Sequence, residues 1–247
     1  MKKRTAMVLL AFVFCCTCWS QITEGKNMAK VNLSAFAGKG FGLQYERQVG
    51  KRITVALGYS AIPASSIAFK SFIENQINND QAKAAVVDIK NFSLGTSIFT
   101  PEARYYFGRD GSFHGLYLAP YVRFGHYNLE GPITYTTSTG ARRDVFFNGS
   151  LNATTGGLMM GSTFHLSKRL YLDWWIIGAS IGGASGNFVA KTELSSTEQQ
   201  SLKSQLDNLD IKFTNIKSEV NGSGATVASS GSIAGVRGLG FNVGIRF

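Results

Sequence analysis

Cysteines, prolines and long apolar runs are scarce in this chain, and each scarcity excludes a class of protein. All three cysteines, Cys15, Cys16 and Cys18, lie within the first twenty residues, so the remainder has no disulfide framework and no cysteine ligand or nucleophile. No stretch beyond them is apolar for long enough to cross a membrane as a helix. With 18 phenylalanines and 9 tyrosines but only 4 prolines, the composition favours strands.

The N-terminal segment is typical of a secretory signal peptide. It begins with three basic residues, continues with an apolar run from Ala6 to about Cys16, and ends in small residues before Gln21. The apolar run is too short to span a membrane. We expect an ordinary signal peptidase to remove residues 1–20, with lipidation at one of the three cysteines as the alternative.

Charge gives no indication of a nucleic-acid partner. The net charge of the whole chain is +10, and three of these charges belong to the N-terminal segment, which leaves +7 for the rest. No run of lysine and arginine longer than two follows that segment, and the aromatic residues follow strand periods instead of alternating with basic ones. We expect no nucleic acid among the partners.

Histidine is also rare, and its three occurrences, His114, His126 and His165, form no recognisable site. No motif places a nucleophile beside a base, and the spacing offers no metal cage. The sequence therefore predicts neither an enzyme nor a bound metal or cofactor. An outer-leaflet lipid-modifying enzyme stays an alternative, for which His126 near a loop serine would be the first indication.

Eight segments alternate large apolar residues with small or polar ones. The clearest is the C-terminal "GLGFNVGIRF", in which every second residue from Leu239 to Phe247 is large and apolar. Such a period of two is typical of a strand with one apolar face. The eight segments cover about residues 30–37, 40–48, 52–61, 92–107, 114–127, 145–165, 169–181 and 232–247. In the fourth, a change of phase predicts a bulge near Ile98–Pro101.

The joints between these segments indicate the fold class. Every second joint is a tight turn ("VGKR", "GRDGS", "LSKR"), whereas the others, after a short first one, are long. Outer-membrane barrels have short periplasmic turns and longer external loops. We therefore predict an all-β fold: an eight-stranded antiparallel up-and-down transmembrane β-barrel over residues 28–247, with helix-containing external loops and a periplasmic segment at 21–27. A soluble lipocalin-like barrel is the alternative.

One hairpin carries a resemblance to a known family. The segment "TPEARYYFG" at 100–108, followed by "GLYLAPYVRFGHY" at 115–127, resembles the small outer-membrane barrels of Bacteroidota, a family of unknown function. The architecture is broadly similar to the OmpA-type and OmpX-type barrels. The resemblance implies contact with outer-membrane lipid, and it implies that Phe247 acts as the C-terminal aromatic read by the barrel-assembly machinery. It supplies no catalytic residues.

The phase of the strands predicts which side chains enter the lumen and which face lipid. An eight-stranded barrel is filled by side chains, so enclosed opposite charges must pair. We expect a salt-bridged plug, with an ion pathway as the alternative, formed by Glu46, Arg52, Glu102, Arg104, Arg123, Asp173 and Arg246. Candidates for aromatic girdles at the membrane interfaces are Tyr45, Tyr59, Tyr105, Phe107 and Trp174.

The last long loop predicts a helix at about residues 196–220. Ser195 and Glu198 form a capping box at its start. Its apolar residues recur every three or four positions and form the stripe Leu202, Leu206, Leu209, Phe213, Ile216 and Val220. A second, weaker helix is predicted near 71–89. The stripe either forms a lid on the barrel or docks a partner that the sequence does not identify.

These observations favour a structural or surface-interaction role for the protein, exerted through the external loops. A narrow-pore channel for small solutes, a lipid-modifying enzyme and a soluble ligand-binding barrel are the alternatives that the sequence leaves open.

Overall fold

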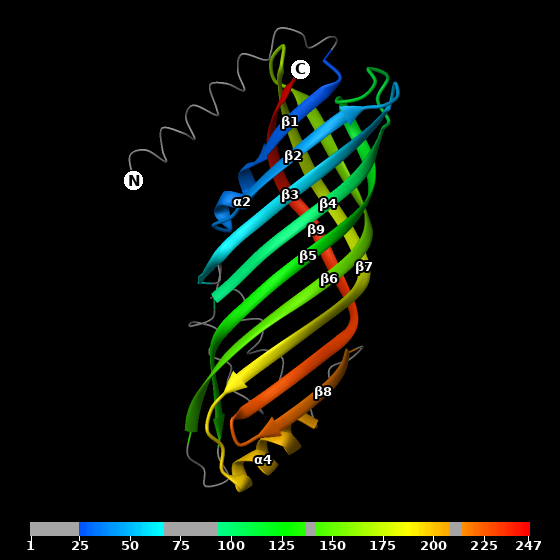
Figure 1. The fold of residues 1–247 in the computed structure, drawn as a ribbon. Helices are drawn as coiled ribbons and strands as arrows, with labels where there is room; N and C mark the ends of the chain where they lie inside the picture. The colour runs from blue at the N-terminus through cyan, green and yellow to red at the C-terminus, as the bar shows by residue number, and fades with distance from the viewer. Residues whose placement is uncertain (1–24, 67–92, 137–141, 208–213) are drawn as a thin grey trace, which may run out of the picture.

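One antiparallel sheet closes on itself in the computed structural model, which describes residues 25–66, 93–136, 142–207 and 214–247. Eight strands form a ring in the order β1-β2-β3-β4-β5-β6-β7-β9, and pairing of β1 with β9 closes it (Figure 1). This confirms the predicted eight-stranded barrel. The elements are β1 (Asn27–Asn32), α2 (Leu33–Ala37), β2 (Phe41–Gln48), β3 (Ile53–Ser66), β4 (Ser93–Tyr106), β5 (Gly115–Thr136), β6 (Arg142–His165), β7 (Leu170–Lys191), α4 (Ser196–Asp207), β8 (Thr214–Asn221) and β9 (Gly224–Arg246).

The tight turns lie at the end of the barrel that holds the C terminus, as the sequence predicts (Figure 1). They join β2 to β3, β4 to β5, and β6 to β7. The predicted signal peptide and the weaker helix near 71–89 lie outside the described residues. Among the residues that the structure describes, no helix is both long and apolar enough to cross a membrane.

The strands differ greatly in length, and this divides the molecule into two parts. Strands β1 and β2 have 6 and 8 residues, whereas β6 and β9 have 24 and 23. All eight ring strands lie side by side only near the tight turns, and we call this part the closed barrel. Farther out, β5, β6, β7 and β9 continue without β1–β4, and β8 pairs with the outer end of β9 (Figure 1). We call this part the distal sheet.

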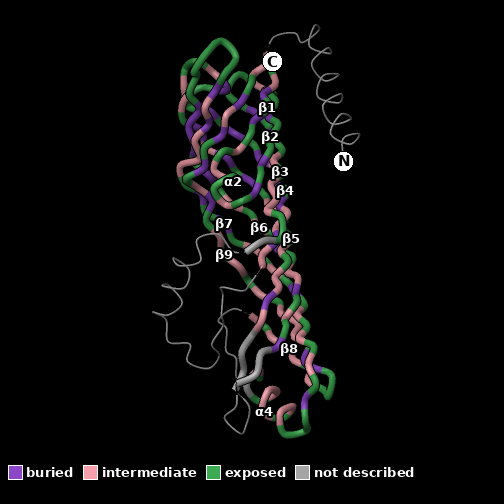
Figure 2. Tube along the Cα trace, turned by 90° about the vertical axis from the view of Figure 1, so that its left-hand side faces the viewer, coloured by how far each residue is buried: buried purple, intermediate pink, exposed green. Residues whose placement is uncertain are grey.

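Side chains alternate between the two faces of the closed barrel. Its outer face carries large apolar residues in every ring strand, among them Val31, Leu43, Leu57, Phe99, Val122, Leu158, Ile177 and Phe241. Its lumen face is buried and largely polar, and buried residues are concentrated in this part of the molecule (Figure 2). An apolar belt around a closed barrel is typical of a surface that faces lipid.

Three local predictions are wrong. The first predicted strand ends at Asn32, because the Asn32 side chain accepts a hydrogen bond from the Ala35 amide at 3.0 Å and so caps α2. The predicted bulge in β4 is absent, since β3 and β4 stay in register from Ile53–Tyr105 to Ile62–Thr96. The shift instead follows Ile62 in β3.

The third wrong prediction is the outer half of the long loop helix. Helix α4 ends at Asp207, and the segment from Thr214 to Asn221 is strand β8. Residues Ile216, Ser218 and Val220 point to one face and alternate with polar neighbours, so they fit a strand as well as a helix. The turn between β8 and β9 consists of Gly222 and Ser223, and the pairing of Asn221 with Gly224 closes this hairpin.

Candidate functional site in the lumen and its lateral cavity

Six charged side chains fill the lumen of the closed barrel, and their charges cancel. The cations are Lys30, Arg104 and Arg237, and the anions are Glu46, Glu102 and Asp173; all six are buried. We call this set the lumen network. Because taking a charge out of water is costly unless it is paired, the equal numbers are what an enclosed cluster requires.

Arg104 lies at the centre of the network. Its Nη1 lies 2.8 Å from Asp173 and 3.0 Å from Glu46, and its Nε donates to Glu102 at 2.6 Å. The guanidinium also lies over the Tyr117 ring, 4.4 Å from its centroid. Arg104 of β4 thus contacts all three carboxylates of the lumen network, which lie on β2, β4 and β7.

The other two cations complete the network from the strands beside the closing seam. Lys30 of β1 contacts Glu46 and donates to Asp173 at 2.6 Å. Arg237 of β9 donates to Glu102 at 2.6 Å. The cluster therefore joins β1, β2, β4, β7 and β9 across the lumen.

Neutral side chains satisfy the remaining carboxylate oxygens. Tyr106 donates to Glu46 at 2.8 Å, and Thr54 donates to the same oxygen at 2.5 Å. Tyr117 donates to Asp173 at 2.7 Å. This hydrogen bonding leaves a plug of charges and hydroxyl groups that crosses the barrel.

Sequence phase located four members of this network: Glu46, Glu102, Arg104 and Asp173. The other three predicted lumen residues lie elsewhere. Arg52 is exposed in the turn before β3. Arg246 lies at the end of the barrel that holds the tight turns, where it donates to the Gly25 carbonyl and to the Tyr171 hydroxyl. Arg123 is inside the barrel but outside the network.

Lys30 and Arg237 were missed for different reasons. Lys30 is in phase with Asn32, so the alternation of the first strand contained the signal. Arg237 is out of phase with the C-terminal pattern, because Leu239 has a φ of 53° and neither Leu239 nor Ile176 of β7 has a paired partner. This irregularity reverses which residues face the lumen, and no alternation rule predicts it.

A cavity of about 450 Å³ lies next to the network, on the side away from the tight turns. It is lined by α2, by β2, β3 and β4, by Arg123 of β5 and Trp175 of β7, and by residues 236–242 of β9. The Arg237 guanidinium lies 4.1 Å from the centroid of the Trp175 ring. We call this space the lateral cavity.

The wall of the barrel is interrupted beside the lateral cavity. One edge of β9 pairs with β7. Its other edge pairs with β8 up to Gly231 and with β1 from Asn242 onward, and no described strand pairs with this edge between Gly231 and Asn242. Helix α2 occupies part of this interval, where Ser34 Oγ accepts a hydrogen bond from the Phe241 amide at 2.8 Å. The exposed side chains of Val236 and Leu239 border the interruption.

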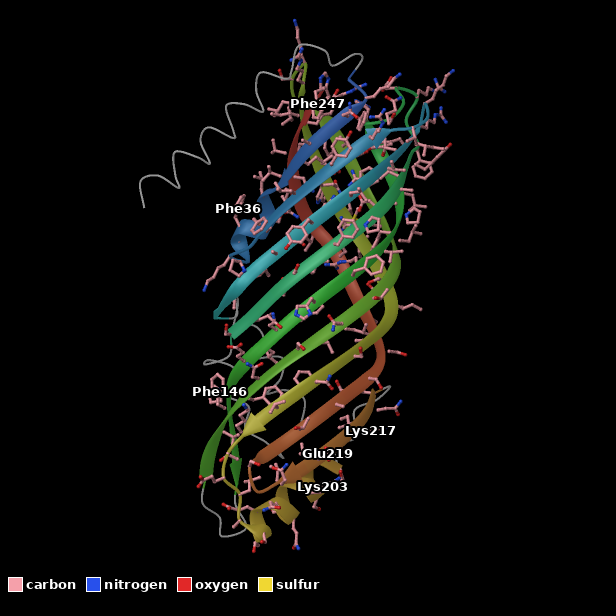
Figure 3. All side chains as sticks on the ribbon, viewed as in Figure 1. Phe36, Phe146, Lys203, Lys217, Glu219 and Phe247 are labelled. Carbon is pink, nitrogen blue, oxygen red and sulfur yellow. The ribbon has the colours of Figure 1, made fainter. Side chains whose placement is uncertain are left out.

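The distal sheet has the opposite polarity to the closed barrel. Its outer face is mostly polar and includes Asn152, Ser185, Asn187 and Ser230; Phe146 is an exposed exception (Figure 3). Its inner face is apolar, and the Phe147 and Phe188 rings stack with centroids 5.2 Å apart. These two rings line a second cavity of about 450 Å³.

The loop stripe contributes to this apolar inner face, although only part of it is helical. Leu202 of α4 and Val220 of β8 pack against the buried pair Val145 and Leu194. Leu206 and Ile216 line the second cavity. Leu209 and Phe213 lie outside the described residues. The four described members thus cover the distal sheet. The polar residues Lys203, Lys217 and Glu219 belong to the same two elements, α4 and β8 (Figure 3).

The capping box is present at the start of α4. The Glu198 carboxylate accepts from the Ser195 amide at 2.9 Å, and the Ser195 hydroxyl accepts from the Glu198 amide at 3.4 Å. At the other end of α4, Asp207 accepts from Lys203 and from Ser218 of β8. These two hydrogen bonds hold the pKa of the Asp207 carboxyl below its ordinary value.

The histidines lie apart from the lumen. His126 contacts Asn152 through its Nδ1 at 2.7 Å on the outer face, His114 pairs with Asp110, and His165 stacks on Tyr171. Within the described part of the chain, no group of three or more histidine, cysteine, aspartate or glutamate side chains is arranged to bind a metal.

Phe247 lies at the end of the ring strand that closes the barrel (Figure 3). Its amide donates to the Asn27 carbonyl at 2.8 Å, and its carbonyl accepts from the Asn27 amide at 2.9 Å. This pair of hydrogen bonds joins the two ends of the ring. Predicted girdle residues, including Tyr45, Tyr59 and Tyr105, are exposed on the outer face of the closed barrel.

Comparison with known proteins gives a family and a set of similar folds. The model of the family described as "Protein of unknown function (DUF3575)" matches residues 8–182. No curated protein matches the chain. The identities to solved structures are low and the TM-scores lie below 0.5, so these likenesses establish no shared function.

Two similar solved structures illustrate this. The N-terminal β-barrel domain of Pseudomonas aeruginosa OprF has 14% identity and a TM-score of 0.28, over 90% of this chain and 96% of that one. Acinetobacter baumannii CarO has 14% identity and a TM-score of 0.38, over 92% and 100%.

Proposed function

The chain belongs to DUF3575, a family of unknown function, and we propose that this member is an integral outer-membrane barrel that binds ligands or partners at the cell surface and conducts no solutes. The apolar belt supports insertion into lipid, since every ring strand contributes to it. The lumen network carries the rest of the proposal. A cluster of six paired charges that crosses the lumen leaves no continuous aqueous path.

Location is tested by fractionation and by mobility on a gel before and after heating. The proposal expects recovery with the outer membrane and a heat-dependent shift in mobility, both weakened when Phe247 is deleted. The deletion has this effect because it removes the hydrogen bonds to Asn27 and the side chain that we propose the assembly machinery reads. A soluble protein without a mobility shift would instead support the ligand-binding barrel.

Conduction is tested with purified barrel in planar bilayers. The proposal expects no discrete conductance from the unaltered chain, because the lumen network blocks the closed barrel. Replacing Arg104 with alanine removes the central cation and is expected to produce irregular leak. Steady single-channel conductance from the unaltered chain would contradict the proposal and would support the narrow-pore alternative.

A further inference from the structure

We propose that the lateral cavity binds a single-chain amphiphile with an anionic head group, and that its chain passes through the interrupted wall between α2 and β9 into the surrounding lipid. This inference rests on the proposed membrane location. It specifies a class of ligand, and a path for the ligand's acyl chain, for the binding role proposed above.

The first support is an excess of positive charge in the lumen. The six charges of the lumen network cancel, so Arg123 adds a charge that nothing in the network balances. Among the described residues, Arg123 has no hydrogen-bond or ion-pair partner, and its charged neighbour is another cation, Arg237. Since a partly buried cation gains most from a charged acceptor, the site favours an anion.

The second support is a buried donor without an acceptor. Trp175 lines the lateral cavity, and its buried Nε1 has no hydrogen-bond partner within the described part of the chain. A buried N–H group that lacks an acceptor carries a desolvation cost that a ligand oxygen removes. Arg123 and Trp175 belong to the same cavity lining, so an anion that pairs with Arg123 would lie in the cavity beside Trp175.

The third support is the continuity of the cavity with the apolar outer face. The lining includes Phe41, Leu43 and Tyr59, which are exposed on the belt, and Val236 at the free edge of β9. An acyl chain that leaves the cavity there contacts lipid and avoids water, which is favourable. The volume of about 450 Å³ lies within the usual range for a small-molecule site.

An amphiphile with an anionic head group and an apolar chain satisfies these three conditions. A neutral or cationic amphiphile would leave Arg123 without a charged partner among the described residues. The acyl chain of the ligand must also be narrow, because α2 occupies part of the interruption in the wall and is held to the edge of β9 by the hydrogen bond of Ser34. This favours one acyl chain over the two chains of a phospholipid.

Trp175 supplies the measurement. The chain lacking residues 1–20 contains two tryptophans, Trp174 and Trp175, so Trp174→Phe leaves Trp175 of the cavity lining as the single tryptophan. This protein is refolded into phosphatidylcholine bilayers and titrated with 9,10-dibromostearate, whose bromine atoms quench tryptophan on contact. We expect saturable quenching, and about tenfold weaker half-saturation for Arg123→Gln, as the loss of a charge-assisted hydrogen bond implies.

A matched control and an independent variant keep the test decisive. Arg52→Gln removes the same charge from an exposed turn and should leave quenching unchanged. Gly58→Val fills the cavity without changing its charge, and a Cβ at Gly58 meets its nearest neighbours at 3.5 Å or more. We expect Gly58→Val to abolish saturable quenching. Equal effects of Arg52→Gln and Arg123→Gln would overturn the proposal.

Two further ligands distinguish the chemistry and the source. The methyl ester of 9,10-dibromostearate has the same chain without the charge, and we expect it to quench without saturation and without dependence on Arg123. Brominated phosphatidylglycerol has an anionic head group on two chains. Quenching by this lipid that depends on Arg123, with none by dibromostearate, would overturn the single-chain assignment.

The route is tested by closing the interruption. Without its first twenty residues the chain has no cysteine, so Ser34→Cys with Leu239→Cys introduces the only pair. Ser34 Oγ already lies 3.4 Å from the Leu239 carbonyl oxygen. Oxidation should slow quenching at least tenfold, and a reductant should restore it; unchanged rates would refute the lateral route. A conducting barrel would instead refute the proposed function, whatever the quenching result.

Discussion

The closed barrel and the distal sheet are built from the same strands but have opposite polarity. In the closed barrel, β6 and β7 present Leu158 and Ile177 outward and enclose charged groups. In the distal sheet, the same two strands present Asn152 and Asn187 outward and enclose Phe147 and Phe188. The alternation continues along each strand, and only the kind of residue on each face changes.

The comparison shows that a period of two specifies a strand but not its surroundings. A polar interior behind an apolar exterior is typical of a barrel that faces lipid, and charges enclosed there must be paired. An apolar interior with a polar exterior is the ordinary arrangement in water. The change in polarity therefore marks where the proposed membrane ends along β5, β6, β7 and β9.

The largest expected effect comes from breaking the charged interior. Arg104→Met leaves Glu46, Glu102 and Asp173 with two cations in a buried cluster. We expect a loss of about 3–5 kcal/mol in the free energy of unfolding, because a buried charge loses its partner. Urea titration of the refolded barrel measures this loss, and Arg52→Met is the exposed control. A change of similar size in both variants would contradict the importance of the network.

A smaller effect should separate the two outer faces. Leu57→Arg places a charge on the belt of the closed barrel, where we expect a cost of about 2–4 kcal/mol. Asn187→Arg makes the matched change on the outer face of the distal sheet, where we expect a change within about 0.5 kcal/mol. Both are measured by urea titration in phosphatidylcholine vesicles. Equal losses of unfolding free energy in the two variants would mean that Leu57 and Asn187 face the same surroundings.

The apolar interior of the distal sheet should be separable from the closed barrel. Leu194 is buried against Val145 beside Leu202, and Leu194→Ala removes this packing at a cost of about 2 kcal/mol. We expect faster amide hydrogen exchange in α4 with unchanged exchange in β2 and β3. Faster exchange throughout the ring would show instead that the two parts unfold together.

The smallest expected effect is a pH dependence at the junction of α4 and β8. The pKa of Asp207 is lowered by hydrogen bonds from Lys203 and Ser218, so its stabilising contribution is present above the unfolded pKa of about 4. It is lost as the pH falls through the lower folded value. Hydrogen exchange in α4 should therefore accelerate in acid. Asp207→Asn should remove this dependence, and an unaltered pH response in that variant would disprove the assignment.

Much of the fold was predictable, because strands and tight turns depend on local pattern. Alternation located the ring strands, and the tight turns placed their joints at one end. The lumen was harder to predict. Four of its charges followed from phase, but Arg237 did not, since Leu239 shifts the phase within β9.

Two other features depended on contacts between distant parts of the chain. The residues from Thr214 to Asn221 fit two periods, and pairing with β9 selects the strand. The lateral cavity has no local signal, because residues of β5, β7 and β9 meet α2 only when the ring is closed. The sequence identified Arg123 as a lumen residue but could not show that it has no partner among the described residues.

The position of Lys30 gives the lumen network a consequence for folding. Lys30 lies on the first strand and reaches Asp173 of β7, while the ring closes by pairing Met28 with Arg246. This pairing spans nearly the whole chain, so its loop-closure entropy makes it a late step. A slip of one residue at the seam would turn Lys30 outward to the belt and remove one of the two cations that contact Glu46 and Asp173. The network therefore acts as a check on register, because only one alignment of the closing strands neutralises the interior.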